Sequence, residues 1–187
     1  MHLFIKNMVC NRCILVVQQE LEKLDIPYSK IDLGDVELVK APAPEKLEAL
    51  GKQLHTLGFE LLDDKKTTLV EKLKTTVIRL IHGNENETLN TKLSVYLQEA
   101  LQVDYHYLST LFSSTEGLTI EKYVILQRIE RVKELLQYDE MNLSEIADSL
   151  GYSSVQHLSQ QFKKVTGLTP TGYRQLKENN RKPLDKV

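Results

Sequence analysis

Near the start of the chain, Met8, Cys10 and Cys13 form a Met-x-Cys-x-x-Cys motif, which contains the only two cysteines of the sequence. Two residues between the thiols let both sulfurs face one ion, and soft thiolates select Cu(I) or Zn(II). The motif directly precedes a helical pattern, and a helix N-terminus lowers the pKa of a thiol. We therefore expect a metal site at Cys10 and Cys13. Cu(I) is the easier fit, because Zn(II) needs two further ligands. A purely structural loop and a redox-active dithiol are the alternatives.

The segments around this motif alternate between strand and helix patterns. Alternating side chains predict strands at 3–6, 29–33 and 36–39, and a last strand follows Gly58 at 59–62. Apolar residues recur at helical spacing in 11–24 and 44–57, which predicts two helices. Gly34-Asp35 suits a two-residue hairpin, because glycine accepts a positive φ. The order β-α-β-β-α-β predicts a ferredoxin-like α+β domain over residues 1–66, with two helices on one face of an antiparallel sheet.

A Met-x-Cys-x-x-Cys loop on this order of elements resembles the heavy-metal-associated domain. The resemblance covers residues 1 to about 64 and rests on the topology and on Met8, Cys10 and Cys13. It implies that the two cysteines are metal ligands and that Met8 is an apolar anchor beneath the loop. The sequence departs from the family pattern at Asn7, where a glycine often stands, and Arg12 places a cation between the cysteines.

The second part of the chain contains an internal repeat. Residues 93–123 and 143–173 align at an offset of 50 without a gap, and nine of the 31 aligned positions are identical. The identical pairs are Leu93/Leu143, Ser94/Ser144, Leu108/Leu158, Ser109/Ser159, Phe112/Phe162, Gly117/Gly167, Leu118/Leu168, Thr119/Thr169 and Tyr123/Tyr173. One supersecondary unit therefore occurs twice, which is typical of a duplicated module rather than of a solenoid.

The second copy shows what this unit is. Asn142 is a capping residue with Glu145 at the third helical position, and Gly151 ends that helix. Ser153 can cap the next helix, which stops at Gly167. Two short helices joined by a tight, glycine-containing turn predict a helix-turn-helix.

The solvent side of the second helix carries side chains suited to DNA. These are Ser154, Gln156, His157, Gln160 and Gln161, which can bond base edges in the major groove, while Lys163 and Lys164 at the end of the helix suit phosphates. The alternative is an ordinary helical hairpin with a polar, solvated face.

The sequence of this copy closely resembles that of the AraC-type DNA-binding domain. The resemblance as a whole covers about residues 67–178. The matching run is Ile146-Ala147, Leu150-Gly151-Tyr152-Ser153-Ser154, His157-Leu158-Ser159, Phe162-Lys163-Lys164, Gly167-Leu168-Thr169-Pro170 and Tyr173-Arg174. The resemblance implies an all-α domain with two helix-turn-helix units bridged by a long helix at 120–137. It assigns base reading to Gln156, His157 and Gln160 in copy two. In copy one it assigns His106, Ser109 and Thr110, on a helix at 104–114.

Copy one departs from the motif, because Leu97 replaces the small residue Ala147 and Leu101 replaces Gly151. Its two helices are therefore expected to sit further apart. Before it, an apolar stripe from Leu69 to Ile81 predicts the first helix of the AraC-type domain. The alternative is that part of this stripe is the seam of a homodimer. Residues 179–187 are expected to form a flexible tail.

Charge is unevenly distributed along the 187 residues. The formal net charge is -2, but residues 152–187 hold seven basic and two acidic side chains, Arg174 among the basic ones. A basic end on an acidic chain is a local electrostatic footprint that fits DNA. There is no signal-like start and no apolar run near the roughly 20 residues that span a bilayer, so we expect a cytoplasmic protein without a membrane partner.

These patterns together predict a sequence-specific transcriptional regulator that binds double-stranded promoter DNA, with residues 1–66 as a regulatory or metal-sensing module. The interpretation requires no cofactor beyond Cu(I) or Zn(II) at the cysteine pair. We find no nucleophile–base pair, phosphate loop or carboxylate pair, so an enzyme is not expected. The alternative is a metal-trafficking protein whose helical part binds a protein partner.

Overall fold

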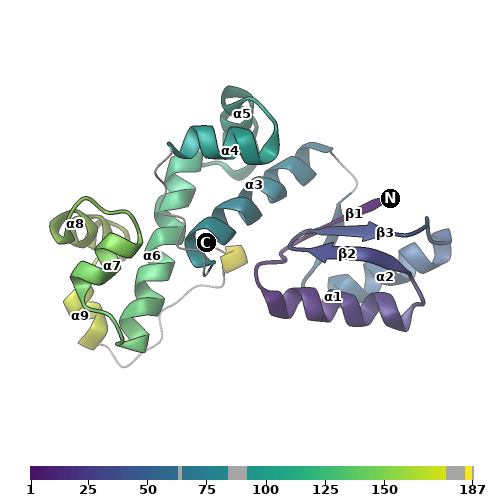
Figure 1. The fold of residues 1–187 in the computed structure, drawn as a ribbon, viewed down its shortest axis with the longest axis horizontal. Helices are drawn as coiled ribbons and strands as arrows, with labels where there is room; N and C mark the ends of the chain where they lie inside the picture. Colours follow the sequence, from purple (N-terminus) through teal and green to yellow (C-terminus); the bar gives the residue numbers. More distant parts are fainter. Residues whose placement is uncertain (63–64, 84–91, 176–183, 187) are drawn as a thin grey trace. The chain divides into compact units, whose positions relative to one another are not determined.

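The computed structural model describes residues 1–62, 65–83, 92–175 and 184–186. It forms two compact units, Met1–Thr75 and Thr76–Val187 (Figure 1). The division lies within helix α3 (Lys65–His82), later than the predicted boundary after residue 66. The first part of α3 belongs with the sheet because Lys72 Nζ lies 3.8 Å from the Asp35 carboxylate and 4.3 Å from the centre of the Phe4 ring.

The first unit contains one four-stranded sheet and two helices besides the start of α3. In chain order these elements are β1 (His2–Lys6), α1 (Asn11–Lys23), β2 (Tyr28–Asp32), β3 (Asp35–Leu38), α2 (Pro44–Thr56) and β4 (Glu60–Leu62). The strand order is β2-β3-β1-β4, and each neighbouring pair is antiparallel. Helices α1 and α2 lie on one face of the sheet (Figure 1).

Alternation along β1 divides its side chains between the two faces of the sheet. Leu3 and Ile5 are buried with Val17 and Leu21 of α1 and with Leu50 of α2, which makes the core of this unit. The hairpin between β2 and β3 turns one residue earlier than predicted, and its glycine, Gly34, has the positive φ (79°) that the turn requires.

The second unit is helical throughout the part that the structure describes. Its elements are the rest of α3, then α4 (Leu93–Leu101), α5 (Tyr105–Glu116), α6 (Ile120–Tyr138), α7 (Leu143–Ser149), α8 (Val155–Thr166), α9 (Pro170–Gln175) and a single 3-10 turn, η1 (Leu184–Lys186). Figure 1 shows α6 running from the α4–α5 pair to the α7–α9 group. The long helix predicted at 120–137 is thus present, one residue longer.

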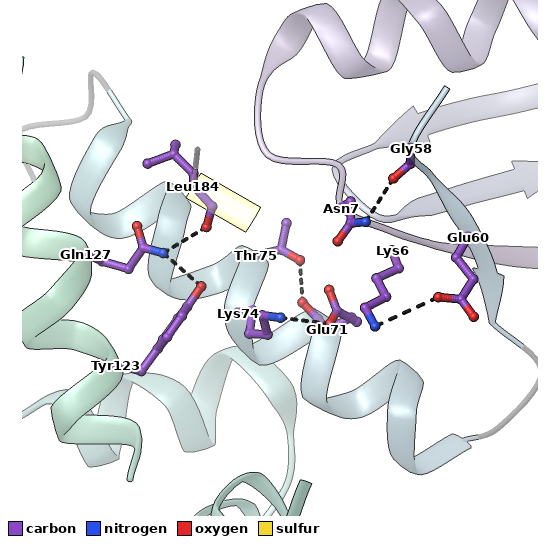
Figure 2. Close-up of polar contacts among 10 residues, drawn as sticks. All are labelled: Lys6, Asn7, Gly58, Glu60, Glu71, Lys74, Thr75, Tyr123, Gln127 and Leu184. Atoms are coloured by element: carbon purple, nitrogen blue, oxygen red, sulfur yellow. Dashed lines mark hydrogen bonds and ion pairs between the residues drawn. The ribbon is translucent and has the colours of Figure 1, made fainter. Parts of the chain in front are cut away.

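Helix α6 buries polar as well as apolar side chains. Gln127 is fully buried and donates to the Tyr123 hydroxyl (3.0 Å) and to the Leu184 carbonyl (3.2 Å), as Figure 2 shows. Lys133 donates to Glu130 (2.6 Å) where both side chains are at most one-tenth exposed. Leu184, Asp185 and Lys186 belong to the predicted tail, 179–187, whose other residues lie outside the described part of the chain.

Among the helices that the structure describes, no segment has the length and hydropathy needed to cross a membrane.

Candidate nucleic-acid interface and dithiol loop

The two copies of the repeat have matching helix ends. Asp104 caps α5 by accepting from the Tyr107 amide (3.2 Å), and Ser154, 50 residues later, caps α8 by accepting from the His157 amide (3.1 Å). Both helices end at a left-handed glycine, Gly117 (φ 71°) and Gly167 (φ 80°). The cap of α8 lies one residue later than predicted, at Ser154 rather than Ser153.

The cores of the two copies also correspond. Phe112 packs on Tyr123 with ring centroids 5.5 Å apart, and Phe162 packs on Tyr173 at the same distance. All four rings are at most 4% exposed. The repeat seen in the sequence is therefore a repeat in space, in which each copy buries an aromatic pair between its second helix and the helix that follows.

Helix α8 presents the predicted polar surface to solvent. Leu158 and Phe162 are fully buried on its inner side. The predicted DNA-facing residues on or beside it are exposed, namely Ser154, Gln156, His157, Gln160, Lys163 and Lys164, whereas Gln161 is half-buried. Lys163 and Lys164 stand in the last turn, where cations also interact favourably with the helix dipole.

The side chain of His157 is held by its neighbours although it is exposed. Its Nδ1 lies 3.1 Å from Ser153 Oγ, and its ring meets the edge of Tyr152 at 5.4 Å. Tyr152 is itself buried and donates its hydroxyl proton to Gln161 Oε1 (2.7 Å). Burial raises the pKa of Tyr152 to about 12, although the positive charge of Arg128 nearby acts to lower it. His157 is thus an exposed ring on a fixed platform.

Copy one presents a different surface on α5. His106 and Thr110 are exposed as predicted, but Ser109 is half-buried. Tyr107, which is not among the residues predicted to read bases, is 47% exposed. Tyr107 aligns with His157 at the offset of 50, so the repeat in the sequence is enough to place Tyr107 at the position equivalent to His157.

The turn of copy one also differs from that of copy two. The left-handed residue after α4 is Gln102 (φ 54°), whereas after α7 it is Gly151 (φ 69°), which aligns with Leu101. Helix α4 is accordingly longer than α7, with nine residues against seven. Leu97 and its counterpart Ala147 are both buried, so the larger side chain is accommodated within the core.

The charge of the two copies is unequal. Helix α5 has no basic residue in its last turn, where α8 has Lys163 and Lys164. Arg174, predicted to face DNA, donates to the Met141 carbonyl (2.9 Å) and lies 3.3 Å from Asp139. Arg174 therefore fastens the turn between α6 and α7 while it remains exposed.

The dithiol loop belongs to the first unit, at the N-terminus of α1. Cys10 is the N-cap residue and is exposed, Cys13 is half-buried, and their sulfurs lie 3.6 Å apart. Two sulfurs bound about 2.3 Å from one ion can be separated by at most roughly 4.6 Å, so this spacing fits a shared ion. Met8 is buried (2% exposed), and Asn7 adopts a left-handed conformation (φ 70°) at the position where the sequence departs from the glycine expected from the resemblance.

The expected lowering of thiol pKa at the helix N-terminus does not hold for Cys13. Burial of the Cys13 thiol raises its pKa and outweighs the lowering by backbone hydrogen bonds with Val9 and Cys10. In the part of the chain that the structure describes, no three or more His, Cys, Asp or Glu side chains gather as metal ligands. The described donor set is therefore two sulfurs, which suits Cu(I) better than four-coordinate Zn(II).

Comparison with known proteins gives one match within the second unit and one that extends over most of the chain. The family described as "Helix-turn-helix domain" matches residues 97–176. The "Probable transcriptional regulator LumQ" of Photobacterium leiognathi is 32% identical over 179 residues, which cover 89% of this chain and 70% of LumQ. An alignment of that extent also takes in most of the first unit.

Two further matches are confined to about half of the chain or somewhat more. The "Msm operon regulatory protein" of Streptococcus mutans is 27% identical over 56% of this chain and 36% of its own length. The solved C-terminal domain of AraT, a response regulator from Geobacillus stearothermophilus, has a TM-score of 0.51 at 22% identity and covers 64% of this chain and 95% of that domain. The AraT comparison shows a shared fold.

Proposed function

Because this chain belongs to the AraC-type helix-turn-helix transcriptional regulators, we propose that it regulates transcription by binding promoter DNA in a sequence-specific manner through α5 and α8. One observation carries the proposal: the two copies are matched in caps and cores, yet each turns a different set of exposed polar side chains to solvent. Conserved packing with divergent surfaces suits two helices that read different bases.

Each recognition helix would enter a major groove on the same side of the duplex, about one helical turn (~34 Å) apart. In copy two, Gln156, His157 and Gln160 would contact base edges, with Lys163 and Lys164 on phosphates. In copy one, His106 and Thr110 would be joined by Tyr107. No arginine projects from either helix, so strong bidentate readout of guanine is not expected.

A selection from randomised duplexes tests this proposal. The full, reduced chain should enrich a site with two half-sites about one turn apart, and its affinity should fall steeply with salt. Binding of equal strength to selected and random duplexes would contradict sequence-specific regulation.

For the first unit, we propose a ferredoxin-like, heavy-metal-associated type of domain that makes the regulator responsive to metal. The order of its elements, the strand order β2-β3-β1-β4 and the paired thiols support this assignment. Cys10 and Cys13 would hold Cu(I), and a bound ion would supply a charge and a cross-link at the start of α1. Regulation also requires that the ion bind the DNA-competent and DNA-incompetent arrangements unequally.

The double variant Cys10→Ser/Cys13→Ser tests the metal site. It should lose Cu(I) uptake in competition with a chelator while retaining DNA binding, because neither thiol belongs to the helix-turn-helix unit. Uptake as tight as that of the parent would place the site elsewhere. Normal regulation by the variant across metal concentrations would make the loop structural.

The proposed role as a DNA-binding regulator also implies where the protein acts and in what oligomeric state it binds. A regulator of this type acts on DNA in the cytoplasm, and the AraC-type pattern of two helix-turn-helix units per chain allows binding as a monomer or a homodimer. The alternative of a metal-trafficking protein is not favoured, because LumQ and the Msm protein, to which this chain is similar, are both named as regulators.

A further inference from the structure

A cavity of about 1330 Å³ opens within the first unit, between α2, the first two turns of α3 and the ends of β1 and β4. Helix α2 lines it with one face, from Pro44 to Thr56, and α3 lines it from Lys65 to Lys72. Pockets for small molecules commonly measure about 300–1,000 Å³, so the space exceeds what such a ligand needs. Cys10 and Cys13 do not line it, which separates it from the dithiol loop.

The lining of the cavity is largely apolar. Its apolar lining includes Leu3 and Phe4 of β1, Leu61 of β4, Leu47 of α2 and Leu69 of α3. Leu47, Leu61 and Leu69 are only half-buried in the structure. A ligand with an apolar body would therefore remove the exposed part of these leucines from water.

A glycine in the middle of α2 keeps this lining open. Gly51 lies within the helix at a cavity-lining position, although glycine costs roughly 1 kcal/mol relative to alanine in a helix interior. A methyl group at this position would lie 3.5 Å from Leu61 Cδ1, an ordinary contact. Alanine would therefore fit, whereas a large side chain would occupy the cavity.

The charged residues around the cavity are mainly basic. Lys52, Lys65 and Lys72 line it, and Glu48 is the one carboxylate among the lining residues that the structure describes. Residues 1–66 as a whole hold nine basic and 11 acidic side chains, so the balance is reversed here. Lys52 and Glu48 pair at 2.7 Å, but both are more than two-thirds exposed and such a pair contributes little. Lys52 keeps N–H donors for an incoming anion.

We propose that this cavity binds an organic acid with an extended apolar chain. The chain would lie along the leucine-lined floor, and the carboxylate would meet the lysines at the opening. This effector site is separate from the dithiol, and its occupancy does not depend on DNA or on metal.

Calorimetric titration of the full chain with decanoate, without DNA and below the micellar concentration, tests the proposal. We expect saturable 1:1 binding, with the uncharged analogue decanol at least tenfold weaker because it cannot form charge-assisted hydrogen bonds with the lysines. An absence of saturable binding, or equal binding of decanol, would overturn it.

Three variants locate the site. Gly51→Phe should abolish decanoate binding, while Gly51→Ala should keep it. Lys52→Gln/Lys65→Gln should weaken it about tenfold, and Lys40→Gln, an exposed lysine outside the cavity, should not. Circular dichroism checks that each variant folds, and the lysine pair keeps the test decisive if Gly51→Phe does not. Full decanoate binding by folded Gly51→Phe or by the lysine variant would refute the assignment.

Discussion

Tyr152 and His157 pack edge to face across the turn of the second helix-turn-helix, with ring centroids 5.4 Å apart and an interplanar angle of 82°. The tyrosine is 6% exposed and the histidine is exposed, so a core residue supports a surface residue. Ser153 holds the same ring from its Nδ1 side at 3.1 Å. An exposed side chain that is already ordered loses less entropy when it binds.

Substitution His157→Ala should weaken binding to the selected duplex by about 1–3 kcal/mol, because one base-edge contact is lost. Random duplex should be bound almost as before. Tyr152→Phe is the matched control. It keeps the aromatic ring that packs on His157 and should leave both affinities within about twofold, which is roughly 0.4 kcal/mol. Fluorescence anisotropy at fixed salt measures both. Equal losses on selected and random duplex would show that His157 does not read a base.

The raised pKa of Tyr152 predicts a stability change at high pH. Burial raises this pKa to about 12, whereas the unfolded chain has the ordinary value of about 10. Between these values the unfolded chain has lost the phenol proton that the folded protein keeps. The free energy of unfolding should therefore fall as pH rises, by up to about 1.4 kcal/mol per pH unit from this group. Tyr152→Phe removes the effect, so urea unfolding from pH 9 to 12 should show a shallower decline; parallel declines would refute it.

Tyr107 should contribute to DNA binding from copy one. It is 47% exposed on α5 and aligns with His157, and an aromatic ring can make apolar contact with a thymine methyl. Tyr107→Ala should reduce affinity for the selected site about tenfold, a loss of roughly 1.4 kcal/mol, and relax base preference in one half-site only. Tyr138→Ala is the control, since Tyr138 is 61% exposed at the end of α6. Unchanged preference in both half-sites would exclude Tyr107 from the interface.

Local signals in the sequence were enough to predict much of the helical unit. Capping residues, glycines and the offset of 50 located the four helices of the repeat to within a few residues, because caps and left-handed turns are short-range structures. The capping box of Asn142 and Glu145 is present as expected. The N-cap of α8 is Ser154 rather than Ser153, and the sequence alone does not distinguish these two adjacent serines because either hydroxyl can cap a helix.

Long-range contacts account for what the sequence did not predict. Arg174 donates a hydrogen bond to the Met141 carbonyl, 33 residues away, and no local pattern around Arg174 predicts this contact. Glu130 and Lys133 would be assigned to a solvated helix face, yet they are buried together because other parts of the second unit surround α6. Burial likewise reverses the expected direction of the Cys13 pKa.

Gln127 should be essential for the stability of the second unit. It is fully buried, donates to Tyr123 and Leu184, and lies 3.1 Å from His82 Nε2. Gln127→Ala removes these contacts and leaves a cavity, so the free energy of unfolding should fall by about 2–4 kcal/mol. Gln175→Ala, at an exposed position of α9, should change it by less than about 0.5 kcal/mol. Hydrogen exchange of the α6 amides measures the loss, and equal protection in both variants would count against the role of Gln127.

Lys163 and Lys164 should supply affinity without sequence preference. They are exposed in the last turn of α8, beyond the residues expected on base edges, so their ammonium groups are suited to phosphates. Each phosphate contact contributes about 0.9 to the slope of log affinity against log salt concentration. Lys163→Gln/Lys164→Gln should therefore lower that slope by about 2 and weaken selected and random duplexes alike, whereas Lys40→Gln should do neither. A loss confined to the selected duplex would instead make these lysines base-reading residues, because a phosphate contact cannot distinguish one sequence from another.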